Sequence, residues 1–394
     1  MLIRDGYISN KEKIKNIEIK NPSNFGNIIG ILSDGETLLI QKSGWNSSTL
    51  GISTDGGNTI IWGNHSFGSG GVYKLVGFIE TNDNEILIST AEKSGSSPAI
   101  GQVWKSQGWN KTTANATSWK IVAETVGTGV QFNGRWGFNE RCKIISNDNL
   151  NGTLVIAEYG TPVSTALSNF SDANKAAIRV KISYDNGETW KDIFNLYEHY
   201  NRKNAQFHVH GVAVDNLFKR ILISYGDGND GHGGECGVIY CNFEDLSNPT
   251  WRDIPSTVSR NPLWRQVTTI IPTEDFIAFI SDSKIGSIRV VPRISYRHYG
   301  EITDIVSLPQ AIIGSNAFKY KNKYIFTYQV ESQNDHKPCI YEYENGTFTE
   351  IYKHAELRTT GMGIFNCVID NKGNVYANIS LDGNNRLLKG MYTE

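Results

Sequence analysis

The stretch that decides the fold is Ser183-Tyr184-Asp185-Asn186-Gly187-Glu188-Thr189-Trp190, because its residues have separate roles in a tight hairpin turn. An aspartate in such a turn accepts hydrogen bonds from backbone N–H groups of its own loop, and glycine supplies a positive φ. Thr-Trp then starts the next strand with a large apolar side chain. A second copy, Ser53-Thr54-Asp55-Gly56-Gly57-Asn58-Thr59, lies upstream and precedes a strand start at 60–62. Two copies of one turn predict a protein built from structural repeats.

A second repeated feature is an alternating apolar run that follows a polar turn. The runs recur at a spacing of about 40 to 70 residues, which is typical of the blades of a repeat protein. They lie at 36–41, 85–90, 153–158, 220–225, 275–280, 323–328 and 374–379.

On the two turns and these runs, the chain resembles the Asp-box, or bacterial neuraminidase repeat, family of sialidase-like β-propellers. The resemblance implies that each Asp-box hairpin joins the two outer strands of a blade and serves as scaffold, on the rim opposite the catalytic face. True sialidases carry an Arg-Ile-Pro motif near the N-terminus, whereas Arg4 lies in Ile3-Arg4-Asp5. The resemblance therefore covers the repeat scaffold and not the sialidase active site.

The predicted fold is an all-β propeller that forms a single domain over residues 1–394. We predict seven blades, with six as the alternative if the first or last repeat is a cap. The last repeat, 362–392, has room for three strands, and an alternating strand at 14–20 has no partner of its own. Pairing the two closes the ring and removes exposed sheet edges. A short helical insertion is predicted at 165–177, in the third repeat.

The composition of the chain gives no indication of a nucleic-acid or membrane partner. The net charge of −2 gives no electrostatic footprint for nucleic acid, and no apolar run reaches the length of about 18 residues that spans a bilayer. Five widely spaced cysteines do not predict a disulfide framework. The N-terminus lacks the pattern of a secretory signal. We expect a secreted, cell-surface or virion-associated protein rather than a cytoplasmic one, and the sequence does not predict the oligomeric state.

The candidate catalytic residues follow second strands or precede inner strands, since these strand ends meet near the axis on one face. The densest cluster contains His208 and His210 before one strand and Asp227 after the next. Alternation along a strand places the two histidines on one face. Two imidazoles and a carboxylate suit proton transfer or, alternatively, metal binding. A structural role across the channel is the third interpretation.

Glu158 and Tyr159 end the third apolar run. Sialidase-like enzymes use a tyrosine nucleophile assisted by a glutamate, so the resemblance implies such roles for this pair. Adjacent residues of a strand point to opposite faces, and we therefore expect only one of the two to be catalytic.

Arg141 and Arg265 are candidates for substrate binding, because a guanidinium group can hold a carboxylate through two parallel hydrogen bonds. This chemistry favours an acidic sugar. The alternative is an ion pair with Asp282 or Glu140 inside the ring.

Three further residues complete the substrate-binding candidates. Trp136 and Trp264 offer flat apolar faces suited to stacking on sugar rings, with packing between blades as the alternative. Asp282 follows the fifth apolar run and lies near the predicted axial face.

The glycine-rich loop 226–237 is a candidate for calcium binding. Its oxygen ligands would be Asp227, Asn229, Asp230 and Glu235, without the full spacing of an EF-hand. A flexible turn is the simpler interpretation, and no motif indicates another cofactor.

These features together predict a propeller whose axial face binds an acidic glycan and cleaves it. A hydrolase would use Asp227 or Glu158 as proton donor, whereas a lyase would use His208 or Tyr159 to abstract a proton beside a uronate. The alternatives are a non-catalytic glycan-recognition module, such as a virion-surface protein, and a purely structural propeller.

Overall fold

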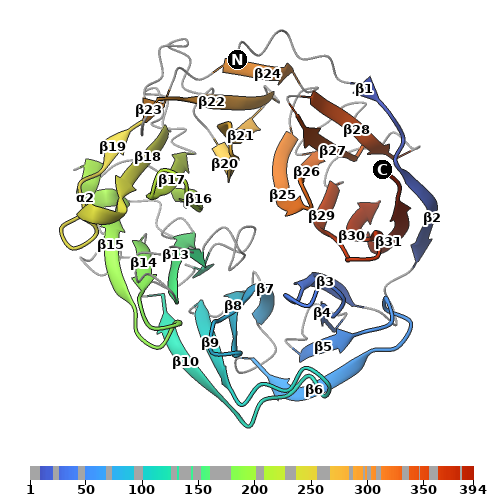
Figure 1. Cartoon of the computed structure of the whole chain (residues 1–394). Helices are drawn as coiled ribbons and strands as arrows, with labels where there is room; N and C mark the ends of the chain where they lie inside the picture. The colour runs from blue at the N-terminus through green and yellow to red at the C-terminus, as the bar shows by residue number, and fades with distance from the viewer. Residues whose placement is uncertain are drawn as a thin grey trace.

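The computed structural model is a ring of antiparallel β-sheets around a central axis (Figure 1). The first strand of each sheet unit lies next to the centre of the ring and the last strand lies at its perimeter. The structure describes residues 9–20, 26–42, 49–67, 73–92, 101–125, 131–132, 143–144, 152–159, 179–200, 208–226, 237–254, 267–283, 287–295, 298–299, 303–307, 312–330, 337–345, 347–354, 363–381 and 384–394.

The first four units follow the order of the chain. Unit 1 contains β3 (Asn27–Ile31), β4 (Leu38–Gln41), β5 (Thr49–Ser53) and β6 (Ile61–Ser66). Unit 2 contains β7 (Tyr73–Glu80), β8 (Ile86–Glu92), β9 (Gln102–Gln107) and β10 (Ser118–Glu124). Unit 3 contains β11 (Gln131–Phe132) and β12 (Lys143–Ile144), which both pair with β13 (Thr153–Tyr159), then β14 (Arg179–Ser183) and β15 (Lys191–Asn195). Unit 4 contains β16 (His208–Asp215), β17 (Arg220–Gly226), β18 (Gly237–Asn242) and β19 (Arg252–Asp253).

The remaining units complete the ring. Unit 5 contains β20 (Val267–Pro272), β21 (Phe276–Ser283), β22 (Ser287–Ser295) and β24 (Thr303–Ser307), with β23 (His298–Tyr299) paired to β22. Unit 6 contains β25 (Ile312–Tyr320), β26 (Lys323–Val330), β27 (Cys339–Glu344) and β28 (Thr347–Lys353). Unit 7 contains β29 (Gly363–Ile369), β30 (Asn374–Leu381), β31 (Asn384–Tyr392) and β2 (Ile14–Lys20). Bridges from β21 to β25 and from β26 to β29 join units 5 to 7 into one 14-stranded sheet.

The hydrophobic core is divided into seven clusters, one between each pair of neighbouring units. Successive residues of a second strand enter different clusters: Leu39 packs towards unit 2, whereas Leu38 and Ile40 pack towards unit 7. The second strands are therefore buried on both faces, which explains why apolar residues occupy successive positions in them, as in Leu38-Leu39-Ile40. The prediction of alternating runs was wrong in this respect, while the prediction of an all-β propeller is confirmed and the units match the predicted seven repeats.

The N-terminal segment closes the ring, as predicted for 14–20. Strand β2 pairs antiparallel with β31 of unit 7, and β1 (Ser9–Asn10) pairs parallel with β28 of unit 6. Between these strands, Lys13 N donates to Ile351 O at 3.0 Å, and Lys13 O accepts from Thr393 N at 2.8 Å. One short segment thus holds the last two units together.

A buried ion pair reinforces this closure. Lys13 Nζ lies 2.7 Å from Glu342 Oε1, and the side chains are 10% and 2% exposed. Tyr392 Oη also donates to Glu342, and Lys323 Nζ donates to Tyr392 Oη at 3.0 Å. The cluster links the N-terminal segment, unit 6 and the final strand.

The two aspartate turns have the predicted hydrogen bonds. Asp185 Oδ1 accepts from Thr189 N at 2.9 Å, and Ser183 Oγ accepts from Gly187 N at 2.8 Å. Gly187 has a φ of 83°. Asp55 makes the equivalent bond to Thr59 N, which lowers the pKa of its carboxyl to about 2. Both turns join the third and fourth strands of a unit.

Helical structure is limited in the described part of the chain to short segments, including α2 (Leu196–Tyr200) and the 3-10 turn η4 (Phe243–Asp245). Neither segment was predicted from the sequence. The predicted insertion at 165–177 lies outside the described residues. No helix within the described ranges is long and apolar enough to cross a membrane.

The closure cluster leads to a stability prediction. We expect Lys13→Met to lower the free energy of unfolding by about 3 kcal/mol, because it leaves the Glu342 carboxylate buried without its nearest cation. The matched control is Lys15→Met, since Lys15 pairs with Glu12 on the exposed surface and such pairs contribute less than about 1 kcal/mol. Urea unfolding measures both, and equal losses in the two variants would contradict the role of the buried pair.

Candidate functional site

Glu158 is the predicted site residue whose environment the structure describes in most detail. It lies at the end of β13, the second strand of unit 3, and its side chain is completely buried. Its Oε2 accepts a hydrogen bond from Arg179 N at 3.1 Å, and its Oε1 lies 3.9 Å from Lys181 Nζ. Oε1 has no hydrogen-bond partner among the described residues. One oxygen therefore accepts a backbone hydrogen bond, and the other lies near the Lys181 amino group without a hydrogen bond among the described residues.

Burial raises the pKa of Glu158 to about 8. The positive charges of Lys181 and Arg179 and the backbone N–H of Arg179 lower it, but they do not offset the loss of solvation. The carboxyl group is therefore protonated at neutral pH. A carboxylic acid that keeps its proton at pH 7 can act as a general acid.

His210 is buried in the first strand of unit 4, where its side chain is 2% exposed. Val209 pairs with Tyr225 and Gly211 pairs with Ser224, so His210 is the extra residue of a β-bulge. Bulges redirect a side chain and interrupt the alternation of faces. The prediction that His208 and His210 share a face relied on unbroken alternation, and it does not follow once the bulge is present.

The bulge is a recurrent feature of the inner strands. Register shifts occur at a corresponding level in units 1, 2, 5 and 6, where the residues between the paired positions are Ile29, Val76, Thr268 and Ser315. The inner strand of unit 7 has a further register shift between Phe365 and Val368, which contains the buried Cys367. Among these six shifts of the described inner strands, only that of unit 4 contains a histidine. The histidine at this position therefore differs from the residues at the matching positions of the other units. This difference is visible in the sequence and could have singled out His210 as a functional residue.

The other predicted residues are only partly described. Tyr159 pairs with Gln131, His208 pairs with Gly226, and Asp282 pairs with Ile313, all through their backbones. The remaining candidates lie outside the described residues: Asp227, Arg141, Arg265, Trp136 and Trp264.

The calcium prediction is also untested. The loop residues 227–236 lie outside the described ranges. Within those ranges, no group of three or more His, Cys, Asp or Glu residues could hold a metal ion. Calcium binding by this loop stays a prediction.

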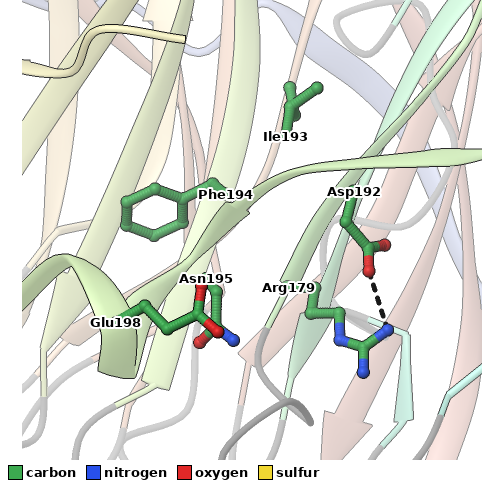
Figure 2. A pocket seen from close by; sticks show the side chains of 6 residues that line it. All are labelled: Arg179, Asp192, Ile193, Phe194, Asn195 and Glu198. Atoms are coloured by element: carbon green, nitrogen blue, oxygen red, sulfur yellow. Dashed lines mark hydrogen bonds and ion pairs between the residues drawn. The ribbon is translucent and has the colours of Figure 1, made fainter. Parts of the chain in front are cut away.

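A pocket of about 350 Å³ lies at the outer edge of unit 3 (Figure 2). Its lining residues come from β14, β15 and α2: Arg179, Asp192, Ile193, Phe194, Asn195 and Glu198. This pocket was not predicted from the sequence. Its lining includes the ion pair of Arg179 on β14 with Asp192 on β15, and such cross-strand pairs depend on register.

A ladder of charged groups connects this pocket to Glu158. Lys181 Nζ lies 2.6 Å from Asp192 Oδ1, and Arg179 Nη1 lies 2.7 Å from Asp192 Oδ2. Lys181 and Arg179 both come from β14, which lies between Glu158 on β13 and Asp192 on β15. The polar groups therefore extend across three adjacent strands, from the neutral Glu158 on β13 through the cations of β14 to Asp192 on β15.

Comparison with known proteins supports the fold without identifying a family. No protein-family model matches the sequence, and no curated protein matches it. A puromycin hydrolase S511A mutant complexed with PGG has a similar structure, with a TM-score of 0.53 and 9% identity over 92% of this chain. The match covers 52% of that protein, so this chain spans about half of its length. At this identity the likeness shows a shared fold alone.

Two carbohydrate-active enzymes are more distant structural neighbours. Trypanosoma rangeli sialidase in complex with sialic acid has a TM-score of 0.46 and 10% identity, over 92% of this chain and 59% of that one. Penicillium chrysogenum alpha-L-arabinanase complexed with arabinobiose has a TM-score of 0.40 and 12% identity, over 80% of this chain and 92% of that one. Neither likeness is strong enough to carry an argument about function.

The pKa of Glu158 predicts a pH-dependent effect of Glu158→Gln on stability. Between the ordinary value of 4.5 and about 8, the folded protein retains a proton that the unfolded chain has lost, so stability falls as pH rises. Glutamine keeps an acceptor for Arg179 N and does not titrate. We expect the melting temperature of the variant, relative to the wild type, to increase from pH 5 to pH 8 and then to level off.

The measurement is differential scanning calorimetry across this pH range. Glu124→Gln is the matched control, because Glu124 is an exposed glutamate on β10 of unit 2. A difference between Glu158→Gln and wild type that does not change with pH would contradict the raised pKa.

Proposed function

We propose that this propeller binds an acidic glycan at the axial ends of units 3 and 4 and cleaves it, with Glu158 as the proton donor. The observation that carries the proposal is a fully buried carboxyl group whose pKa of about 8 keeps it protonated at neutral pH. The two aspartate turns, with their complete hydrogen bonds, support the Asp-box propellers as the related family. In that family the turns belong to the scaffold. We therefore assign substrate binding and catalysis to the strand ends near the axis.

In the hydrolytic form of the proposal, Glu158 donates its proton to the glycosidic oxygen as the bond between that oxygen and the anomeric carbon breaks. In the route with Asp227 as base, water adds its hydroxyl to the anomeric carbon and gives its other proton to Asp227, and proton exchange with solvent then returns both carboxyl groups to their starting states. In the alternative route Tyr159 is the nucleophile, and Glu158 takes the proton from the water that later displaces Tyr159. The overall reaction consumes one water and yields two sugar hydroxyl groups.

In the elimination form, His208 or Tyr159 abstracts a proton beside the carboxylate of a uronate, and Glu158 protonates the leaving oxygen. The product then carries a double bond and no water is consumed. His210, the bulge residue two positions after His208 on the same strand, is assigned to orienting the proton acceptor.

Recognition of an acidic sugar is assigned to Arg141 and Arg265, since guanidinium groups bind carboxylates through two parallel hydrogen bonds. Trp136 and Trp264 are assigned to stacking on sugar rings. Asp282 is assigned to hydrogen bonds with hydroxyl groups or to fixing one of the two arginines.

One observation favours a second candidate function. The side chains of Glu158 and His210 are 0% and 2% exposed, so a ligand reaches them only if the residues that cover them move. Full burial suits polar groups that fill the axial region of a non-catalytic recognition module. Such a module would bind a glycan without turnover.

The test is a screen of the purified chain against uronate-containing, sialylated and neutral glycans, with binding and product release recorded together. We expect cleavage of an acidic glycan that falls by at least about a hundredfold in Glu158→Gln, which is the usual contribution of a general acid. The rate should also fall above pH about 8, because the donor loses its proton there. Ultraviolet absorbance of an unsaturated product distinguishes elimination from hydrolysis.

Glu124→Gln is the control for this screen and should retain full turnover. Glycan binding without turnover would contradict catalysis and would support the recognition module instead. Full turnover in Glu158→Gln would remove Glu158 from the mechanism, and no response to any glycan would contradict the proposal as a whole.

A further inference from the structure

The pocket at the outer edge of unit 3 opens at the same end of the unit as Glu158. Arg179 begins β14 and pairs with Asn195 at the end of β15. Arg179 also donates its backbone N–H to Glu158 at the end of β13. The three strand ends therefore lie at one level of the sheet, with Glu158 towards the axis and the pocket at the perimeter, where Figure 1 shows β15.

The polar lining of the pocket combines hydrogen-bond donors and acceptors on planar groups. Arg179 contributes a guanidinium group, Asp192 and Glu198 contribute carboxylates, and Asn195 contributes a carboxamide (Figure 2). Each hydroxyl group of a sugar both donates and accepts, so neighbouring hydroxyls match such a set of planar groups. The volume lies at the lower end of the range for small-molecule sites.

The charges of the lining do not select an anion. Asp192 is paired with both Arg179 and Lys181, and Glu198 adds a further exposed carboxylate. The cations that could attract an acidic group are therefore already bound to Asp192. A neutral, hydroxyl-rich ligand is favoured over a carboxylate-bearing one.

The apolar part of the pocket is rigidly held. The Phe194 ring is 5.0 Å from the Trp251 ring, and Trp251 Nε1 donates to Ile193 O at 3.2 Å. On the polar side, Asp192 pairs with Arg179 and Lys181, and its own side chain is 42% exposed. The apolar side is therefore organised before a ligand binds, which reduces the entropy cost of binding.

We propose that this pocket is a second saccharide-binding site, which holds a neutral sugar residue of the same glycan chain whose acidic residue binds at the axis. The chain would run outward along unit 3, over the strand ends that connect Glu158 to Asp192. The inference rests on the proposed function for the ligand being a glycan, and it adds that the glycan contains neutral residues beside acidic ones.

The test measures affinity by titration calorimetry with neutral tetrasaccharides of glucose, mannose, galactose and arabinose. We expect at least one of them to bind the wild type, and we expect Glu198→Ala to weaken this binding roughly fivefold or more. Hydrogen exchange of residues 191–200 should slow when that sugar is added. Lys191→Ala is the matched control, because Lys191 lies on β15 but does not line the pocket.

Glu158→Gln separates this inference from the proposed function. We expect it to remove turnover of the acidic glycan and to leave neutral tetrasaccharide affinity unchanged. Binding that Glu198→Ala does not alter would overturn the second site even if turnover depends on Glu158. Binding that depends on Glu198 in a chain without turnover would support the second site and contradict catalysis. No binding of any tetrasaccharide to the wild type would also overturn the inference.

Discussion

The structure depends on the burial of each unit between two neighbours. The second strands present apolar side chains on both faces, and these faces are covered only when a unit lies on each side. A ring with one interface missing would expose two apolar sheet faces, and each large aliphatic side chain in them would lose about 1.5 to 3 kcal/mol of burial free energy. Closure by the N-terminal segment is therefore a requirement of the core.

This arrangement also explains why a buried acid is tolerated. The free-energy cost of burying Glu158 is limited because the group stays protonated and accepts one backbone hydrogen bond from Arg179. The surrounding strands are held by two apolar interfaces that do not involve its carboxyl group. The scaffold can therefore keep a carboxylic acid in an environment that raises its pKa, and the charge ladder from Lys181 to Asp192 extends this polar layer to the perimeter.

The scaffold was predictable from the sequence because its signals are local. The seven apolar runs became β4, β8, β13, β17, β21, β26 and β30, and the unpaired strand at 14–20 became β2. The predicted chemistry of the turns is confirmed, since Asp55 and Asp185 each accept a hydrogen bond from a backbone N–H of their own loop. The environment of Glu158 was not predictable, since it depends on the register that sets Arg179 and Lys181 beside it. The bulge at His210 and the pocket beside Asp192 depend on register in the same way.

The central claim is that Glu158 is a neutral acid at physiological pH. A direct test is the pH titration of its carboxyl carbon by nuclear magnetic resonance on protein labelled with ¹³C in glutamate, with Glu158→Gln used to assign the resonance. The account predicts a midpoint near 8, which burial produces despite the nearby lysine. A midpoint near the ordinary value of 4.5 would contradict it, because the group would then be ionised at pH 7 and could not donate a proton.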